Sequence, residues 1–105
     1  MNDAFLSLLG LCKKAGKLVF GFETVKTAMQ KGSAVIVFSA CDLSLKTAKE
    51  LKFICENLEV ELIETDYDMK TLGSSIGKMT GIVAVTDEGF VKSLKQKLGT
   101  QEDIK

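Results

Sequence analysis

The chain has 105 residues, of which 46% are hydrophobic and 27% charged, and its 14 cations balance its 14 anions. These values predict one globular domain. They exclude a disordered chain, and they argue against a protein that coats nucleic acid without selection, because such proteins are strongly basic. No apolar run is long enough to span a bilayer, so we expect a cytoplasmic protein without a membrane partner.

The first half of the chain alternates between helical and strand patterns. Apolar residues at helical spacing over residues 5–12 predict a helix that ends near Gly16, and residues 18–20 predict a short strand. Helical spacing returns over residues 25–29. Residues 34–38 are apolar throughout, which predicts a strand covered on both faces.

The second half continues the alternation. The expected elements are a helix over residues 48–58, a strand over 60–63, a helix over 69–76, a strand over 82–85 and a helix over 90–98. Asp42 or Ser44 can cap the first of these helices, Asp66 or Asp68 the second and Asp87 the third. Strands that alternate with helices predict an α/β fold with a parallel or mixed sheet between helical layers. We expect one domain over residues 1–98 and a flexible tail over residues 99–105.

The junction at Gly21 is the most informative part of the sequence, because an apolar strand gives way there to a helix. Such a junction presents backbone N–H groups and the positive end of a helix dipole, which suit an anion such as a nucleic-acid phosphate. Residues 11–32 carry five lysines against the single acid Glu23, which leaves a net charge of +4. These lysines are Lys13, Lys14, Lys17, Lys26 and Lys31.

An acidic stretch follows in the middle of the chain. It consists of Glu56, Glu59, Glu61, Glu64, Asp66 and Asp68, with no lysine among them. Two interpretations stay open: one surface that attracts RNA beside another that repels it, or two ordinary solvated surfaces. All 14 cations are lysines, so the chain cannot make bidentate guanidinium contacts to guanine.

Several patterns resemble catalytic or ligand sites but lack the spacing or the residues that such sites need. Residues 73–80 look like a phosphate-binding loop, but the spacing is one residue short, Met79 replaces the hydroxyl residue, and the stretch leads from helix to strand. Cys41 follows a buried strand, but no histidine exists to activate its thiol. Three widely spaced cysteines predict neither a zinc site nor disulfides, and we expect Cys12 and Cys55 in the core. The sequence therefore predicts a binding protein, not an enzyme, with no metal and no cofactor.

Five runs occur in a characteristic order: residues 9–21 (LGLCKKAGKLVFG), 31–34 (KGSA), 39–42 (SACD), 72–78 (LGSSIGK) and 82–90 (IVAVTDEGF). This series resembles the bacterial YlxQ family of the L-seven-Ae/L-thirty-e superfamily of ribosomal and kink-turn RNA-binding proteins. The resemblance extends over nearly the whole chain, roughly from Phe5 to Leu98.

The resemblance implies a three-layer α/β/α sandwich with a mixed, mostly four-stranded central sheet. It implies an RNA site built from the Gly21 junction, the loop after Ala40 and the loop over residues 77–81. The expected partner is a structured RNA, either a kink-turn or ribosomal RNA. Proteins of the ribosome or of another ribonucleoprotein would be further partners. The chain itself is expected to be a monomer. The alternative is a protein-interaction module on the same fold that has lost its RNA contacts and docks through the acidic stretch.

The resemblance also assigns roles at the junction. In the superfamily a polar pair that reads sheared G·A base pairs follows the glycine, and a lysine comes next. These positions fall on Glu23, Thr24 and Thr27, which depart from the usual residues. Lysines would attract the RNA backbone, and the loop around Ile76 and Met79 would cover unstacked bases. The full expected set is Lys13, Lys14, Lys17, Gly21, Phe22, Glu23, Thr24, Lys26, Thr27, Cys41, Asp42, Ile76, Gly77, Lys78, Met79 and Thr80.

Overall fold

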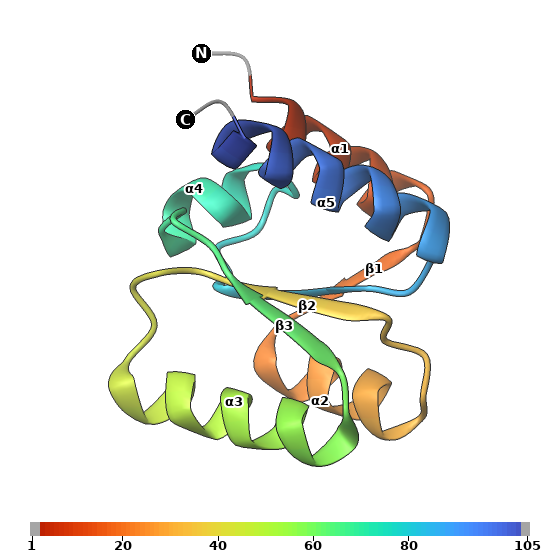
Figure 1. The fold of residues 1–105 in the computed structure, drawn as a ribbon. Coiled ribbons are helices and arrows are strands. Elements are labelled where there is room, and N and C mark those ends of the chain that lie inside the picture. The colour runs from red at the N-terminus through yellow and green to blue at the C-terminus, as the bar shows by residue number, and fades with distance from the viewer. Residues whose placement is uncertain (1–2, 104–105) are drawn as a thin grey trace.

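Helices and strands alternate along the chain in the computed structural model, which describes the backbone of residues 3–103 and the side chains of residues 3–98 (Figure 1). The elements are α1 (Ala4–Lys14), β1 (Leu18–Phe20), α2 (Phe22–Gln30), β2 (Ile36–Ser39), α3 (Leu45–Leu58), β3 (Glu61–Glu64), α4 (Met69–Ser74), β4 (Ile82–Val85) and α5 (Glu88–Asp103). Their order and type confirm the predicted alternation. The second and third strands each begin one or two residues later than the hydrophobic pattern indicated.

The four strands form one mixed sheet in the order β1-β4-β2-β3. Strand β4 is antiparallel to both of its neighbours, and β2 is parallel to β3. The Gly21 N–H donates to the Ile82 carbonyl at 3.0 Å, and the Ala40 N–H donates to the Gly81 carbonyl at 2.8 Å. Gly21, Ala40 and Gly81 therefore share one end of the sheet, which we call the junction end. The other end, where Lys17 precedes β1, is called the opposite end.

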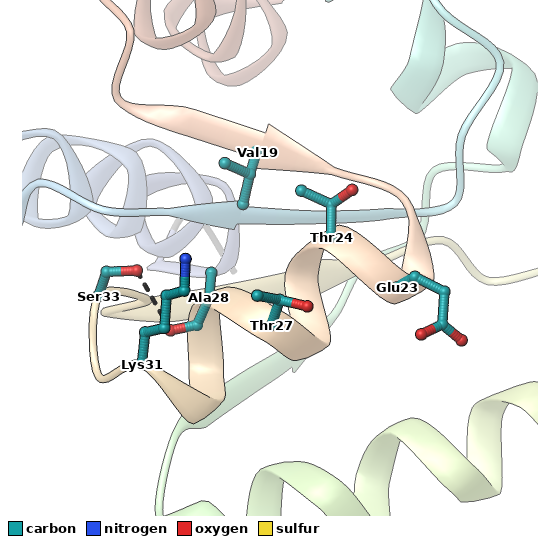
Figure 2. Close-up of a pocket in the computed structure, with 7 residues that line it drawn as sticks. All are labelled: Val19, Glu23, Thr24, Thr27, Ala28, Lys31 and Ser33. Carbon is teal, nitrogen blue, oxygen red and sulfur yellow. Dashed lines mark hydrogen bonds between the residues drawn. The ribbon is translucent and has the colours of Figure 1, made fainter.

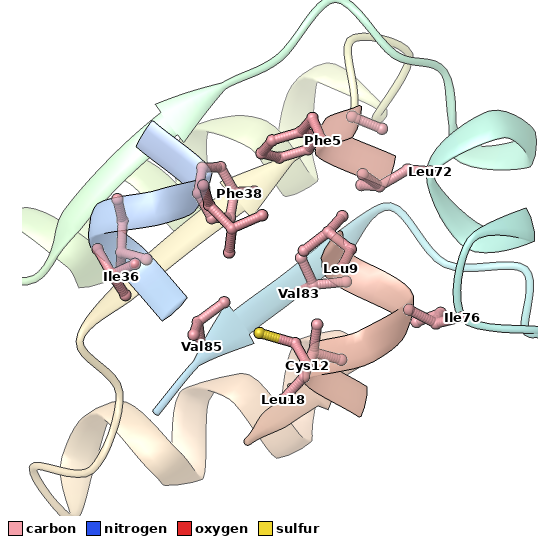
Figure 3. Packing of buried hydrophobic residues seen from close by; sticks show 13 residues of the cluster. Phe5, Leu9, Cys12, Leu18, Ile36, Phe38, Leu72, Ile76, Val83 and Val85 are labelled. Atoms are coloured by element: carbon pink, nitrogen blue, oxygen red, sulfur yellow. The ribbon is translucent and has the colours of Figure 1, made fainter. Parts of the chain in front are cut away.

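Helices cover both faces of the sheet, which confirms the predicted three-layer α/β/α sandwich (Figures 1 and 3). Helices α1, α4 and α5 pack on one face, where Phe5 and Leu9 meet Phe38 and Val83 in the larger core. Helices α2 and α3 pack on the other face, in a core that contains Val25, Met29, Val37, Leu51, Cys55, Ile82 and Ala84. Successive strand residues point to opposite faces, so β2 and β4 contribute to both cores.

Side-chain caps fix where the helices begin, and they decide between the alternatives in the sequence. The Ser44 hydroxyl accepts a hydrogen bond from the Thr47 N–H at 3.2 Å, so Ser44 and not Asp42 caps α3. Asp68 accepts from the Thr71 N–H at 2.7 Å and caps α4, and this bond lowers the pKa of the Asp68 carboxyl. Asp87 caps α5 as predicted, with the Phe90 N–H donating at 3.0 Å.

Helix α5 continues through Gly99 to Asp103. The expectation of a flexible tail over residues 99–105 stays a prediction, and residues 104 and 105 lie outside the described residues. No helix within residues 3–103 has the length and apolar character needed to cross a membrane.

Gly73 holds the turn that leads from α4 into the loop before β4. Its carbonyl accepts hydrogen bonds from the N–H groups of Ile76 and Lys78, at 3.0 and 3.1 Å. A Cβ atom at Gly73 would lie 2.1 Å from the Lys78 carbonyl oxygen and 2.8 Å from the Thr80 nitrogen. Both are backbone atoms, so a side chain here must displace the loop.

We expect Gly73→Ala to lower the free energy of unfolding by about 1–3 kcal/mol, as overpacking against backbone does. Urea denaturation measures this change. Gly89→Ala is the matched control, because its added Cβ would approach a side chain, the Asp87 carboxylate, at 3.1 Å near the start of a helix. Equal urea midpoints for the two variants would contradict the inference that the loop backbone leaves no room for a side chain at Gly73.

Candidate nucleic-acid interface

The N-terminus of α2 is the centre of the candidate site. Gly21 precedes this helix with φ 91° and ψ 145°, a conformation that L side chains rarely adopt, and no side chain caps the helix. The first helical bond runs from the Val25 N–H to the Gly21 carbonyl. The N–H groups of the residues between them have no partner within the helix. An added Cβ at Gly21 would meet nothing within 4 Å, so the space beside this helix end is open.

The loop over residues 75–81 lies beside Gly21 at the junction end, because β4 pairs with β1. Met79 is 74% exposed, and Lys78 is also exposed. Ile76 is only 5% exposed and packs in the larger core, so the prediction that its side chain covers bases is wrong. Thr80 is 9% exposed, and its hydroxyl donates to the Ile82 carbonyl at 3.2 Å, so this side chain supports the loop from inside.

The loop after β2 forms the other side of the site. The Cys41 N–H donates to the Tyr67 carbonyl at 2.8 Å, and an Asp42 carboxylate oxygen accepts from the Met69 N–H at 2.9 Å. These bonds join the loop to the segment between β3 and α4. Both side chains are exposed, but the Asp42 carboxylate already has a structural partner. Asp42 therefore has a structural role, because its carboxylate holds this loop against the start of α4.

A groove of about 420 Å³ runs along α2 beside the edge strand β1 (Figure 2). It is lined by Val19, Glu23, Thr24, Thr27, Ala28, Lys31 and Ser33. Thr24 and Thr27 are exposed. Lys26 does not line the groove, because it lies about 100° around the helix from Thr27.

The structure divides the predicted site residues between the two ends of the sheet. Gly21, Phe22, the loop at Cys41 and the loop at Lys78 lie at the junction end. Lys17 lies at the opposite end, where its carbonyl accepts from the Thr86 N–H at 2.9 Å. Four residues of extended chain separate Lys17 from Gly21, which is about 14 Å at 3.4 Å per residue. Lys13 and Lys14, in the last turn of α1, precede Lys17 and are exposed.

Charge is distributed unevenly between the two edges of the sheet. The acidic stretch includes Glu61 and Glu64 on the edge strand β3, and both side chains are exposed. The lysine-rich segment surrounds the other edge strand, β1. Within the part of the chain that the structure describes, the one ion pair joins Lys95 to Glu61 at 3.0 Å, and it lies outside the groove. Glu23 is the acid in the first turn of α2, where it competes with an external anion for the helix end.

Sequence reasoning left four groove residues out of the expected site: Val19, Ala28, Lys31 and Ser33. The signal for Lys31 was present, because it follows Thr27 by four residues and so shares its side of the helix. Val19 and Ser33 come from neighbouring segments, and their position depends on how α2 packs against β1. Only the tertiary structure brings them to the groove.

The described residues contain no group of three or more histidine, cysteine, aspartate or glutamate side chains that could hold a metal ion. The fold and the loop cluster at the junction end define a three-layer α/β/α protein with an open helix N-terminus beside two loops. A model of the ribosomal protein L7Ae/L30e/S12e/Gadd45 family matches residues 3–95. The chain therefore belongs to this family.

Relatives with similar sequences include bacterial proteins named YlxQ. The RNA-binding protein YlxQ of Enterococcus faecium is 33% identical over 91 residues, which is 87% of each chain. The RNA-binding protein YlxQ of Bacillus subtilis is 36% identical over 88 residues, which is 83% of this chain and 87% of that protein. These similarities confirm the resemblance to YlxQ proteins that the sequence motifs indicated.

Solved structures with the same fold include a protein of unknown function from Bacillus halodurans. It has a TM-score of 0.85 and 30% identity, and the match covers 93% of this chain and 99% of that chain. A 15.5 kD RNA-binding protein of Giardia lamblia has a TM-score of 0.75 at 16% identity, covering 100% and 93% of the two chains. At that identity the second match supports the fold alone.

The three cysteines differ in accessibility. Cys12 and Cys55 are buried, as predicted, whereas Cys41 is exposed. Burial, with a smaller contribution from the charge of Asp87, raises the pKa of the Cys12 thiol to about 11. Burial also raises the pKa of the Cys55 thiol.

We therefore expect a maleimide at pH 8 to label only Cys41 in the folded protein, because the other thiols are buried and protonated. Mass spectrometry should show one adduct per chain under native conditions and three after unfolding in urea. The variant Cys41→Ser serves as the control and should take up no label when folded. Labelling of Cys12 in the native state would contradict the buried position of this thiol.

Proposed function

We propose that this protein binds a structured RNA, such as a kink-turn, at the junction end of its sheet. The observation that carries the proposal is the convergence of the uncapped N-terminus of α2 with two exposed loops. The hydrogen bonds from Gly21 to Ile82 and from Ala40 to Gly81 hold these segments on neighbouring strands. Helix N-termini attract phosphate oxygens, and adjacent loops can contact bases that are splayed from the stack.

Each exposed group at this end suits a part of such an RNA. Gly21 has no side chain, so the RNA can approach the backbone closely. Met79 can cover the face of an unstacked base, and Lys78 can contact a phosphate. Thr24 offers a hydroxyl to base edges, whereas an ionised Glu23 can only accept hydrogen bonds from base amino groups.

The relatives support the same proposal, since both YlxQ proteins are named as RNA-binding. We propose further that the protein is a monomer in the cytoplasm, that it acts within a ribosome or another ribonucleoprotein, and that it is not an enzyme. The sequence contains no histidine that could activate the exposed Cys41 thiol, which argues against a catalytic role.

An electrophoretic mobility shift with a kink-turn RNA at two salt concentrations tests the proposal. We expect binding that weakens as salt rises, since each phosphate contact contributes about 0.7–0.9 to the slope of log affinity against log salt. A second RNA in which the sheared G·A pairs are replaced by Watson–Crick pairs is the control for shape. Equal affinity for both RNAs, or no binding to either, would contradict kink-turn recognition. If the wild-type protein binds neither RNA at either salt concentration, the protein-interaction alternative is favoured.

The junction itself is tested by restoring the residues that the superfamily has there. Thr27→Lys adds a cation to the exposed side of α2, and we expect tighter binding by about 1 kcal/mol, roughly fivefold, as for one charge-assisted contact. Glu23→Asn removes a repelling charge and adds an amide donor, so it should also tighten binding. The two sites lie one turn apart, so their effects need not add. Unchanged affinity in both variants would indicate that RNA does not bind at this helix end.

Gln30→Lys is the matched control for Thr27→Lys. It adds the same charge at an exposed position of α2 that does not line the groove. If Gln30→Lys tightens RNA binding as much as Thr27→Lys does, the gain comes from nonspecific electrostatic attraction. That result would contradict a specific RNA contact at position 27.

A further inference from the structure

We propose that the groove between α2 and β1 holds the sugar-phosphate backbone of an RNA stem, which leaves the junction end and reaches the lysines at the opposite end. This inference rests on the proposed function and extends it, because it assigns a second contact surface to the same RNA. It also gives a role to Lys13, Lys14 and Lys17, which the structure separates from the junction.

The direction of the groove supports this path. Helix α2 leaves Gly21 and runs back along β1, so the groove has one end at Glu23 and Thr24 and the other at Lys31 and Ser33 (Figure 2). The nine residues of α2 span about 13 Å, which exceeds the separation of two successive phosphates on one strand. The groove is thus long enough for a short run of phosphates on one strand.

The side chains in the groove suit a ribose-phosphate chain. Val19 and Ala28 give an apolar floor, and Thr24 and Thr27 place exposed hydroxyls along one wall. Hydroxyl groups commonly donate to phosphate and sugar oxygens and carry no base preference. The groove is open and shallow, in keeping with a backbone that passes along it and not with an enclosed small molecule.

The charges at the far end of the groove are complementary to phosphate. Lys31 lies at that end in Figure 2, and its side chain is exposed. Lys17 directly precedes β1 at the same end of the sheet, and Lys13 and Lys14 lie before it in the last turn of α1. The groove itself contains one acid, Glu23, at the junction end. The groove lining therefore has its acid at the junction end and its lysine, Lys31, at the far end.

The test compares Lys17→Ala/Lys31→Ala with wild type on a kink-turn RNA whose two stems are each longer than α2. We expect the slope of log affinity against log salt to fall by about 1.8, which is 0.9 for each of two lost phosphate contacts. Affinity should fall several-fold, and discrimination between the kink-turn and its G·A-replaced form should stay unchanged. Lys49→Ala/Lys52→Ala is the control, because both lysines are exposed on α3 and do not line the groove.

A cleavage experiment maps the path directly. An iron chelate attached to Ser33→Cys, in a Cys41→Ser background, should cleave the RNA within a stem, several base pairs from the internal loop. The same chelate on the native Cys41 should cleave at the internal loop. Cleavage from position 33 that is absent, or confined to the internal loop, would overturn the proposal.

The outcomes separate this inference from the proposed function. If Lys78→Ala weakens binding while Lys17→Ala/Lys31→Ala leaves affinity and slope unchanged, RNA binds at the junction and the groove proposal is wrong. If the wild-type protein binds no kink-turn, the proposed function fails and the groove proposal fails with it. If the wild-type protein forms a dimer that the double variant abolishes, a second copy of the chain occupies the groove, which would also overturn the proposal.

Discussion

The antiparallel pairing of β4 with both β1 and β2 determines where every candidate RNA contact lies. Strand β4 is the last strand in the chain, yet it lies between the first two, and all four of its residues are buried. Because it runs against both neighbours, the loop that enters β4 meets the segments that leave β1 and β2. A parallel β4 would have placed Gly81 beside Lys17. The loop over residues 75–81 would then not have lain beside the open N-terminus of α2.

The sequence predicts the elements well because each has a clear local signal. Helical spacing, side-chain caps and apolar strands identify the alternation. For two of the helices the sequence offers two possible cap residues, Asp42 or Ser44 and Asp66 or Asp68. The order and direction of the strands have no local signal. Residues 82–85 are apolar throughout, so they lack the alternation that would show which side of the strand faces which layer. The resemblance to a family predicted a mixed sheet, and the strand pairing in the structure gives the order and the directions.

The candidate site was harder to predict, and the errors have physical causes. Ile76 is an apolar residue among glycine, serine and lysine, which suggests an exposed loop residue. The two hydrogen bonds to the Gly73 carbonyl fold the loop back and direct Ile76 into the core. Thr80 satisfies its hydroxyl with the Ile82 carbonyl, so a polar residue is buried at little cost. The lysines before β1 are near Gly21 in sequence, but an extended strand between them carries Lys17 to the other end of the sheet.

The same geometry explains how a chain without net charge can attract a polyanion. The lysine-rich segment surrounds β1, and the acidic stretch includes β3, so the two charge groups occupy opposite edges of the sheet. Three strand spacings of about 4.8 Å separate these edges by about 14 Å. The Debye length at physiological ionic strength is about 8 Å, so salt screens each edge from the other. An RNA strand in the proposed groove beside β1 would therefore experience mainly the nearby lysines, and the acids at β3 would cancel little of that attraction. At low ionic strength the screening length exceeds the separation, and the acidic edge then disfavours any RNA bound on its side of the molecule. Zero net charge with separated edges thus favours one orientation of the bound RNA, which a uniformly basic surface would not do.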